Sequence, residues 1–154
     1  SSRTLRLSQG VADSTSLTAL GVAAHETGHA LQHRDAYKPL VLRTAVVPTV
    51  SIGSNLSWPL FLIGLIFDWQ PLITLGIVFF LLTVLFTLIT LPVEFNASKR
   101  AMTALSSGGY LDADELDGAG RVLKAAAMTY VAAALTAVLQ LLRLLALSNR
   151  RRDR

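Results

Sequence analysis

The hydrophobic pattern of the chain is dominated by two long runs without a formal charge, residues 44–67 and 69–93. A helix over the first run would be about 36 Å long, which is enough to cross the hydrocarbon core of a bilayer. The second run contains LITLGIVFFLLTVLFTLITL, the clearest transmembrane signal in the sequence. The DWQP segment between the two runs is typical of a tight turn. The pattern therefore predicts a transmembrane helical hairpin.

The region before the hairpin has shorter periodicities. Residues 3–8 (RTLRLS) alternate polar and apolar side chains, which predicts a short edge strand. Such an edge could hold an extended peptide through backbone hydrogen bonds. A helix is then expected to run to about Arg34, with Asp13, Ser14 and Ser16 as candidate N-cap residues.

The region after the hairpin predicts further helices. Beyond Pro92 we expect a short helix over 93–105, a loop at 106–109, and a capping box made by Asp112 and Glu115. An Ala- and Leu-rich helix should follow from about residue 121 to 147. Its uncharged stretch, 125–142, either spans the bilayer at the short limit or packs beneath the site without crossing. We favour the spanning interpretation.

These elements predict an all-α integral membrane protein with a short N-terminal edge strand. We interpret the chain as one catalytic membrane domain in four segments. They are an active-site strand and helix (1–43), a transmembrane hairpin (44–93), a pair of shorter helices (94–124), and a long apolar helix with a basic tail (125–154).

The composition supports the membrane assignment. Hydrophobic residues make up 52% of the chain and charged residues only 16%, whereas soluble domains carry about 25% charged residues. The mean hydropathy is +0.50. The net charge of +4 is modest, and the basic residues gather near the ends of apolar segments, so nucleic-acid binding is not expected. The absence of cysteine excludes disulfides, thiolate zinc sites and cysteine nucleophiles.

The sequence His25-Glu26-Thr27-Gly28-His29 is an HExxH motif. Residues four apart lie on one helical face, so the two imidazoles can bind one Zn²⁺ while Glu26 reaches the metal-bound water as general base. Such a trio should occur by chance in on the order of one chain in a few hundred. The alternative is a pair of surface histidines on an amphipathic helix, and the small residues around the motif favour the zinc site.

A catalytic zinc needs a third protein ligand, and Glu94 is the best candidate. It is the only acidic residue between Asp68 and Asp112, and a lone carboxylate beside lipid is costly unless a positive charge compensates it. The hairpin also returns Glu94 to the side of the membrane that holds the motif. The alternative is an interfacial anchor, or an ion-pair partner of Lys99 or Arg100.

The last predicted helix carries a polar stripe on one face, with Tyr130 beside it. Tyr130 or Arg143 could stabilise an oxyanion at the wall of a substrate cavity. The alternative, which we favour, is hydrogen bonding between helices of a bundle. The residues of the stripe are Thr129, Thr136, Gln140 and Arg143.

Four segments, GVAAHETGHALQ, LRTAVVP, TLPVEFNASKRA and TYVAAALTAVLQLLRLL, together resemble the membrane-bound neutral zinc metallopeptidases of bacteria. The resemblance covers essentially the whole chain and implies ligands at His25, His29 and Glu94, with Glu26 as base. It also implies an additional N-terminal membrane segment, so we expect the chain to be a C-terminal portion of a longer protein.

A more distant similarity, to the prenyl-protein and heat-shock membrane zinc proteases, departs at Ser98, where that group has Asp. It leaves Ser98 or Asn96 as candidates for supporting a histidine.

The resulting hypothesis is a zinc metallopeptidase of the bacterial plasma membrane that acts on peptides or proteins, including membrane-associated ones. Basic residues flank the hairpin and are absent from its turn, which places the zinc site on the cytoplasmic side. The alternatives are a non-enzymatic membrane scaffold or metal carrier, and a zinc hydrolase acting on something other than peptides. The flanking basic residues are Arg3, Arg6, Arg34, Lys38, Arg43, Lys99, Arg100, Arg121 and Lys124.

Overall fold

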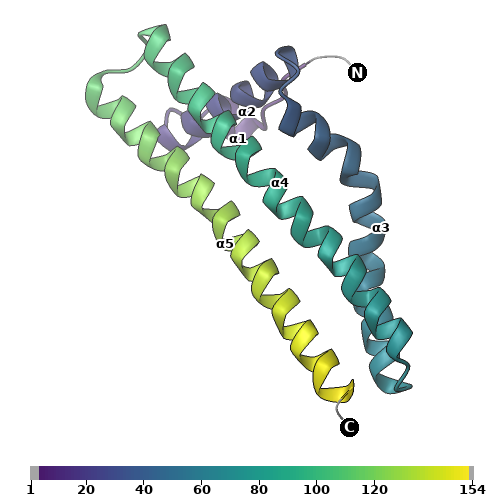
Figure 1. Cartoon of the computed structure of the whole chain (residues 1–154). Coiled ribbons are helices and arrows are strands. Elements are labelled where there is room, and N and C mark those ends of the chain that lie inside the picture. Colours follow the sequence, from purple (N-terminus) through teal and green to yellow (C-terminus); the bar gives the residue numbers. More distant parts are fainter. Residues whose placement is uncertain (1–3, 153–154) are drawn as a thin grey trace. The chain divides into compact units, whose positions relative to one another are not determined.

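The computed structural model describes residues 4–152, with side chains described as far as residue 150, and the described part is helical (Figure 1). The helices are α1 (Gln9–Ala12), α2 (Leu17–Arg34), α3 (Lys38–Ile66), α4 (Gln70–Gly108) and α5 (Ala113–Arg152). Helices α3, α4 and α5 are each long and apolar enough to cross a membrane, judged by length and composition. The all-α prediction is confirmed for this part of the chain.

The predicted edge strand is wrong. Residue 3 lies outside the described residues, residues 4–8 have no regular structure, and α1 starts directly after them. Leu5 and Leu7 are 44% and 37% exposed. A strand needs a neighbour to hydrogen-bond with, and residues 4–152 contain no strand that could pair with it. Alternation of side chains over six residues was too weak a signal.

The helices after the hairpin are longer than predicted. Helix α4 continues through Pro92 to Gly108, where we expected a new helix and then a loop. Proline is tolerated within apolar helices when neighbouring groups satisfy the freed carbonyl. Helix α5 begins at Ala113, well before residue 121. Its start is the predicted capping box, because the amide of Asp112 donates to Glu115 and the amide of Glu115 donates to Asp112.

The chain divides into two compact units. Of the described residues, unit 1 comprises 4–41 and 91–130, and so contains α2 together with the second part of α4 and the first part of α5. Its apolar core is built largely from small side chains, which let the helices approach closely. The buried members of this core are Ala24, Ala101, Leu105, Ala119 and Leu123.

Of the described residues, unit 2 comprises 42–90 and 131–152, and it contains the predicted hairpin of α3 and α4. The two helices are joined by a turn in which Asp68 has a φ of 52°. Phe61, Ile73 and Leu144 form the buried apolar cluster. The hydroxyl of Ser57 donates to the carbonyl of Gly76 at 3.0 Å and ties α3 to α4.

Candidate metal centre

Helix α2 presents both motif histidines from one face. Ser16 caps its N-terminus, because the Ser16 hydroxyl accepts a hydrogen bond from the Ala19 amide at 3.2 Å. The helix is uninterrupted through the motif, so His25 and His29 lie one turn apart. Their ring centroids are 4.7 Å apart and the ring planes are at 85°.

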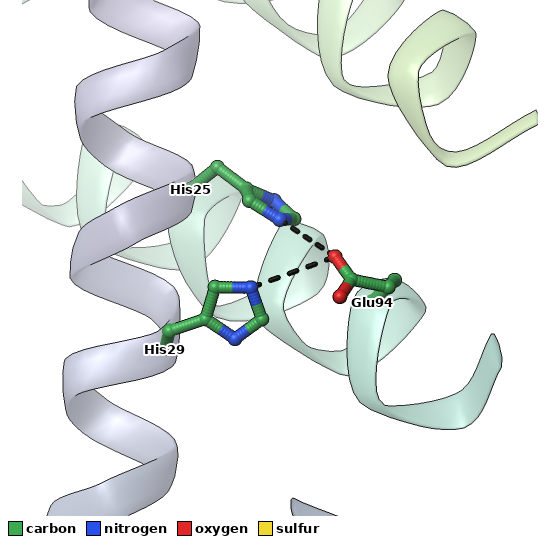
Figure 2. Close-up of side chains that lie close together, drawn as sticks. All are labelled: His25, His29 and Glu94. Atoms are coloured by element: carbon green, nitrogen blue, oxygen red, sulfur yellow. Dashed lines mark hydrogen bonds and ion pairs between the residues drawn. The ribbon is translucent and has the colours of Figure 1, made fainter. Parts of the chain in front are cut away.

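Glu94 of α4 meets both rings. Its Oε2 atom lies 3.0 Å from Nε2 of His25 and 3.5 Å from Nε2 of His29. Figure 2 shows the two rings reaching from α2 toward this carboxylate. Glu94 is buried, with its side chain 1% exposed, and the histidines are mostly buried. The hairpin has therefore brought a residue 65 or more positions away onto the motif face.

The three side chains fit a zinc ion. One ligand atom from each lies within 4.8 Å of the other two. Atoms bound to Zn²⁺ at about 2.0–2.1 Å in tetrahedral geometry are about 3.4 Å from one another, which matches the 3.0 and 3.5 Å separations. Two imidazoles and one carboxylate also form a known catalytic zinc donor set that leaves a fourth position open.

Gly28 explains how α2 and α4 come so close. A Cβ atom at Gly28 would lie 2.2 Å from the carbonyl oxygen of Ala97. Gly28 and Ala97 are both buried, and Ala97 is 0% exposed. The glycine inside HExxH is thus required by the approach of the α4 backbone, which carries Glu94.

Glu26 lies on the exposed side of α2, beside His25. Within the described residues, no hydrogen bond or ion pair occupies its carboxylate. The hydrogen bond with Glu94 raises the pKa of His29 against the opposing effect of burial, and the negative charge of Glu26 is a smaller contribution in the same upward direction. A carboxylate that is exposed and next to the candidate metal ligands can act as a base.

The supporting candidates differ in what they contact. The hydroxyl of Ser98 is 3.1 Å from Nδ1 of His25. Asn96 contacts Gln32 and Arg100 rather than a histidine.

The two oxyanion candidates lie in different units. Tyr130 is half-buried on α5 in unit 1, and Arg143 is exposed on α5 in unit 2. The suggested oxyanion role of these last two stays a prediction.

Sequence reasoning missed Gln32. It lies one turn after His29 and is completely buried, and its Oε1 atom is 2.9 Å from Nδ1 of His29. Its Nε2 atom donates to the carbonyl of Val93 at 2.7 Å and to Oδ1 of Asn96 at 3.0 Å. The available signal was a polar residue three positions after a ligand, on the same helical face.

An ion-pair group lies at the end of α2. The side chain of Asp35 pairs with Arg34 and with Arg100 of α4. Hydrogen bonds from Arg34 and Arg100 lower the pKa of Asp35 to about 2. Asp35 is therefore ionised throughout the neutral range and holds the Arg100 guanidinium. Arg100 in turn donates through Nε to Oδ1 of Asn96 at 2.8 Å.

Comparison with known proteins identifies the family. Residues 1–149 match a family model described as "Putative neutral zinc metallopeptidase". The chain belongs to this family. It is 47% identical over 151 residues to the "Putative membrane protease YugP" of Bacillus subtilis (strain 168), an alignment that covers 98% of this chain and 67% of that relative. No solved structure matches the chain. Family membership implies zinc, and the geometry of His25, His29 and Glu94 suits it.

Proposed function

We propose that this protein is a membrane-embedded zinc metallopeptidase with His25, His29 and Glu94 as ligands and Glu26 as general base. The observation that carries the proposal is the arrangement of the three ligand atoms within 4.8 Å of one another, beside the Glu26 carboxylate, which has no hydrogen-bond or ion-pair partner among residues 4–150. Family membership and the relative named as a membrane protease support the same reaction class.

These residues have separate roles in the proposed reaction. A bound zinc would supply Lewis acidity, lowering the pKa of a water ligand to about 7. His25, His29 and Glu94 would hold the ion, and their own partners would keep the rings and carboxylate oriented. Glu26 takes the proton from the attacking water and passes it to the leaving amine. The substrate of the proposed reaction is a peptide or protein, including ones at the membrane.

The first prediction separates base from ligands. Glu26→Gln should abolish hydrolysis while zinc remains bound, because Glu26 is not a ligand. His29→Ala and Glu94→Ala should each lose the metal and the activity together. Metal content by mass spectrometry and cleavage of a peptide library, with and without chelator, measure both properties.

The outcomes also decide between functions. Full activity in Glu26→Gln, or loss of zinc from it, would overturn the assigned role. Zinc binding without any peptide cleavage by the wild-type protein would favour a metal carrier or a hydrolase of other substrates. A carrier needs no base beside its first histidine, so the position of Glu26 next to His25 favours the enzyme.

The second prediction concerns sidedness. We infer that the zinc site faces the cytoplasm, because Arg43, Lys99 and Arg100 flank the hairpin while its turn carries no basic residue. The chain lacks cysteine, so single probes are easily introduced. Asp68→Cys should react with a membrane-impermeant thiol reagent outside intact cells, and Lys99→Cys only after permeabilisation. The reverse labelling would refute this orientation.

A further inference from the structure

Gln32 is a buried polar side chain whose amide orientation can be worked out. Two nearby groups, the carbonyl of Val93 and the Nε–H of Arg100, each have a single hydrogen-bonding role. Its side chain is 0% exposed, so each of its polar atoms needs a partner within the protein. It contacts His29 on its own helix, and Val93 and Asn96 on α4. Val93 directly precedes Glu94 in the chain. Gln32 therefore touches one proposed ligand and the backbone beside another.

Two independent anchors fix which way the Gln32 amide points. The carbonyl of Val93 can only accept a hydrogen bond, so the Gln32 atom 2.7 Å from it must be the NH₂ group. The Nε atom of Arg100 can only donate, so the Asn96 atom 2.8 Å from it must be Oδ1. That same Oδ1 accepts from Gln32 at 3.0 Å. Both anchors require the Gln32 oxygen to face His29.

The orientation has a consequence for His29. An amide oxygen only accepts, so the Nδ1 atom 2.9 Å from it must carry a proton. A neutral imidazole with a proton on Nδ1 has its lone pair on Nε2. Nε2 is the atom that faces Glu94 at 3.5 Å. By contrast, the Ser98 hydroxyl beside His25 can donate or accept, so it does not determine the tautomer of that ring.

We propose that Gln32 is a positioning residue of the metal centre, oriented by Val93 and by the Arg100–Asn96 pair, which sets the tautomer and ring orientation of His29 so that Nε2 binds the metal. The inference rests on the metal site of the proposed function and not on peptide hydrolysis. The effect of Arg100 on His29 is indirect, because it passes through Asn96 and Gln32.

Zinc affinity tests the proposal. The purified full chain is titrated with Zn²⁺ against a chromophoric chelator. Gln32→Met keeps a similar volume and removes both hydrogen-bonding ends, and it should weaken zinc binding by about 10–100-fold, the usual effect of removing a partner of a metal-bound histidine. Ser57→Ala, which removes a buried hydroxyl in unit 2, is the control and should bind zinc as the wild type does.

A pair of variants at Asn96 separates orientation from packing. Asn96→Asp keeps an acceptor for Arg100 and Gln32, so zinc affinity should stay close to that of the wild type. Asn96→Leu removes the acceptor and leaves the Gln32 amide held by the Val93 carbonyl alone, so affinity should fall, though less than in Gln32→Met. This pair remains informative if Gln32→Met does not fold.

Nitrogen-15 NMR of the histidines in the zinc-loaded wild type reads the tautomer directly. We expect a protonated Nδ1 on His29 and a metal-bound Nε2. A protonated Nε2 with a metal-bound Nδ1 would overturn the proposal, as would wild-type zinc affinity in both Gln32→Met and Asn96→Leu. A wild-type protein that binds no zinc would overturn the metal centre itself, and this role for Gln32 with it.

Discussion

Both units bring helices together at glycines, but they enclose different interiors. In unit 1, Gly28 of α2 lies against the backbone of Ala97, and the interface around this contact contains the buried polar residues Gln32 and Glu94. In unit 2, Gly76 of α4 lies against the backbone of Phe61, and the surrounding cluster is apolar. The same packing device therefore serves a chemical site in one unit and a structural scaffold in the other.

The difference shows what close helix packing can do for a buried site. Small residues let backbones approach, and in an apolar environment this gains van der Waals contact. In unit 1 the approach also places the buried Glu94 carboxylate against two imidazoles, which offset the cost of burying its charge. In unit 2 the approach gains packing and the hydrogen bond from Ser57 to the Gly76 carbonyl, and it buries no charged group. Substitutions that separate the helices should therefore have different consequences in the two units.

The largest effect is expected for Gly28→Ala. Its Cβ would lie 2.2 Å from the Ala97 carbonyl oxygen, and backbone on both sides must move to relieve the clash. Overpacking of this kind costs about 3 kcal/mol of folding stability, and displacement of Glu94 from the histidines should lower zinc affinity by more than about 100-fold. Thermal unfolding and zinc titration measure the two effects.

Gly10→Ala is the matched control for that variant. Gly10 also lies in a helix, α1, but a Cβ there would meet nothing within 4 Å. It should leave stability and zinc affinity unchanged. If Gly28→Ala bound zinc as tightly as Gly10→Ala, the close approach of α2 and α4 would not be what assembles the site.

Gly76→Ala is the corresponding change in unit 2. Its Cβ would lie 2.7 Å from the backbone nitrogen of Phe61, so we expect a loss of about 1–3 kcal/mol of stability. Zinc affinity of the folded protein should not change, because no proposed ligand or ligand partner belongs to unit 2. Loss of zinc from folded Gly76→Ala would show that the division between scaffold and site is wrong.

The same contrast explains which features sequence reasoning could reach. The HExxH motif was readable because its chemistry lies within one helical turn, and Glu94 because acidic residues are rare in that region. The hairpin followed from hydropathy. Gln32 was missed because a polar residue three positions after a histidine is a weak signal by itself, and its partners Val93 and Asn96 are 61 and 64 residues away in the chain. Only the folded contact of α2 with α4 reveals its role.

The wrong predictions, a strand and two helix boundaries, came from local sequence patterns. Alternation over residues 3–8 predicted a strand, but the local pattern carries no information about a partner strand. Pro92 predicted a helix end from local propensity, and the last apolar helix was expected to begin only at about residue 121. In the structure, α4 and α5 run through these positions, because tertiary packing of long apolar helices outweighs the local cost of proline or glycine.

The smallest effects should come from two buried serines that form a matched pair, one in each unit. Ser98 lies 3.1 Å from Nδ1 of His25, and Ser98→Ala should lower zinc affinity by about tenfold, the lower end of the range for partners of metal-bound histidines. Ser57 donates to the Gly76 carbonyl at 3.0 Å, and Ser57→Ala should cost about 0.6 kcal/mol, the average for a hydrogen bond between membrane helices, without affecting zinc. Measuring the zinc affinity and the free energy of unfolding of both variants is the most sensitive test of the comparison between the two units. Equal zinc affinities in the two variants would mean that the Ser98 hydroxyl contributes only packing, and that His25 is oriented by Glu94 and its own helix.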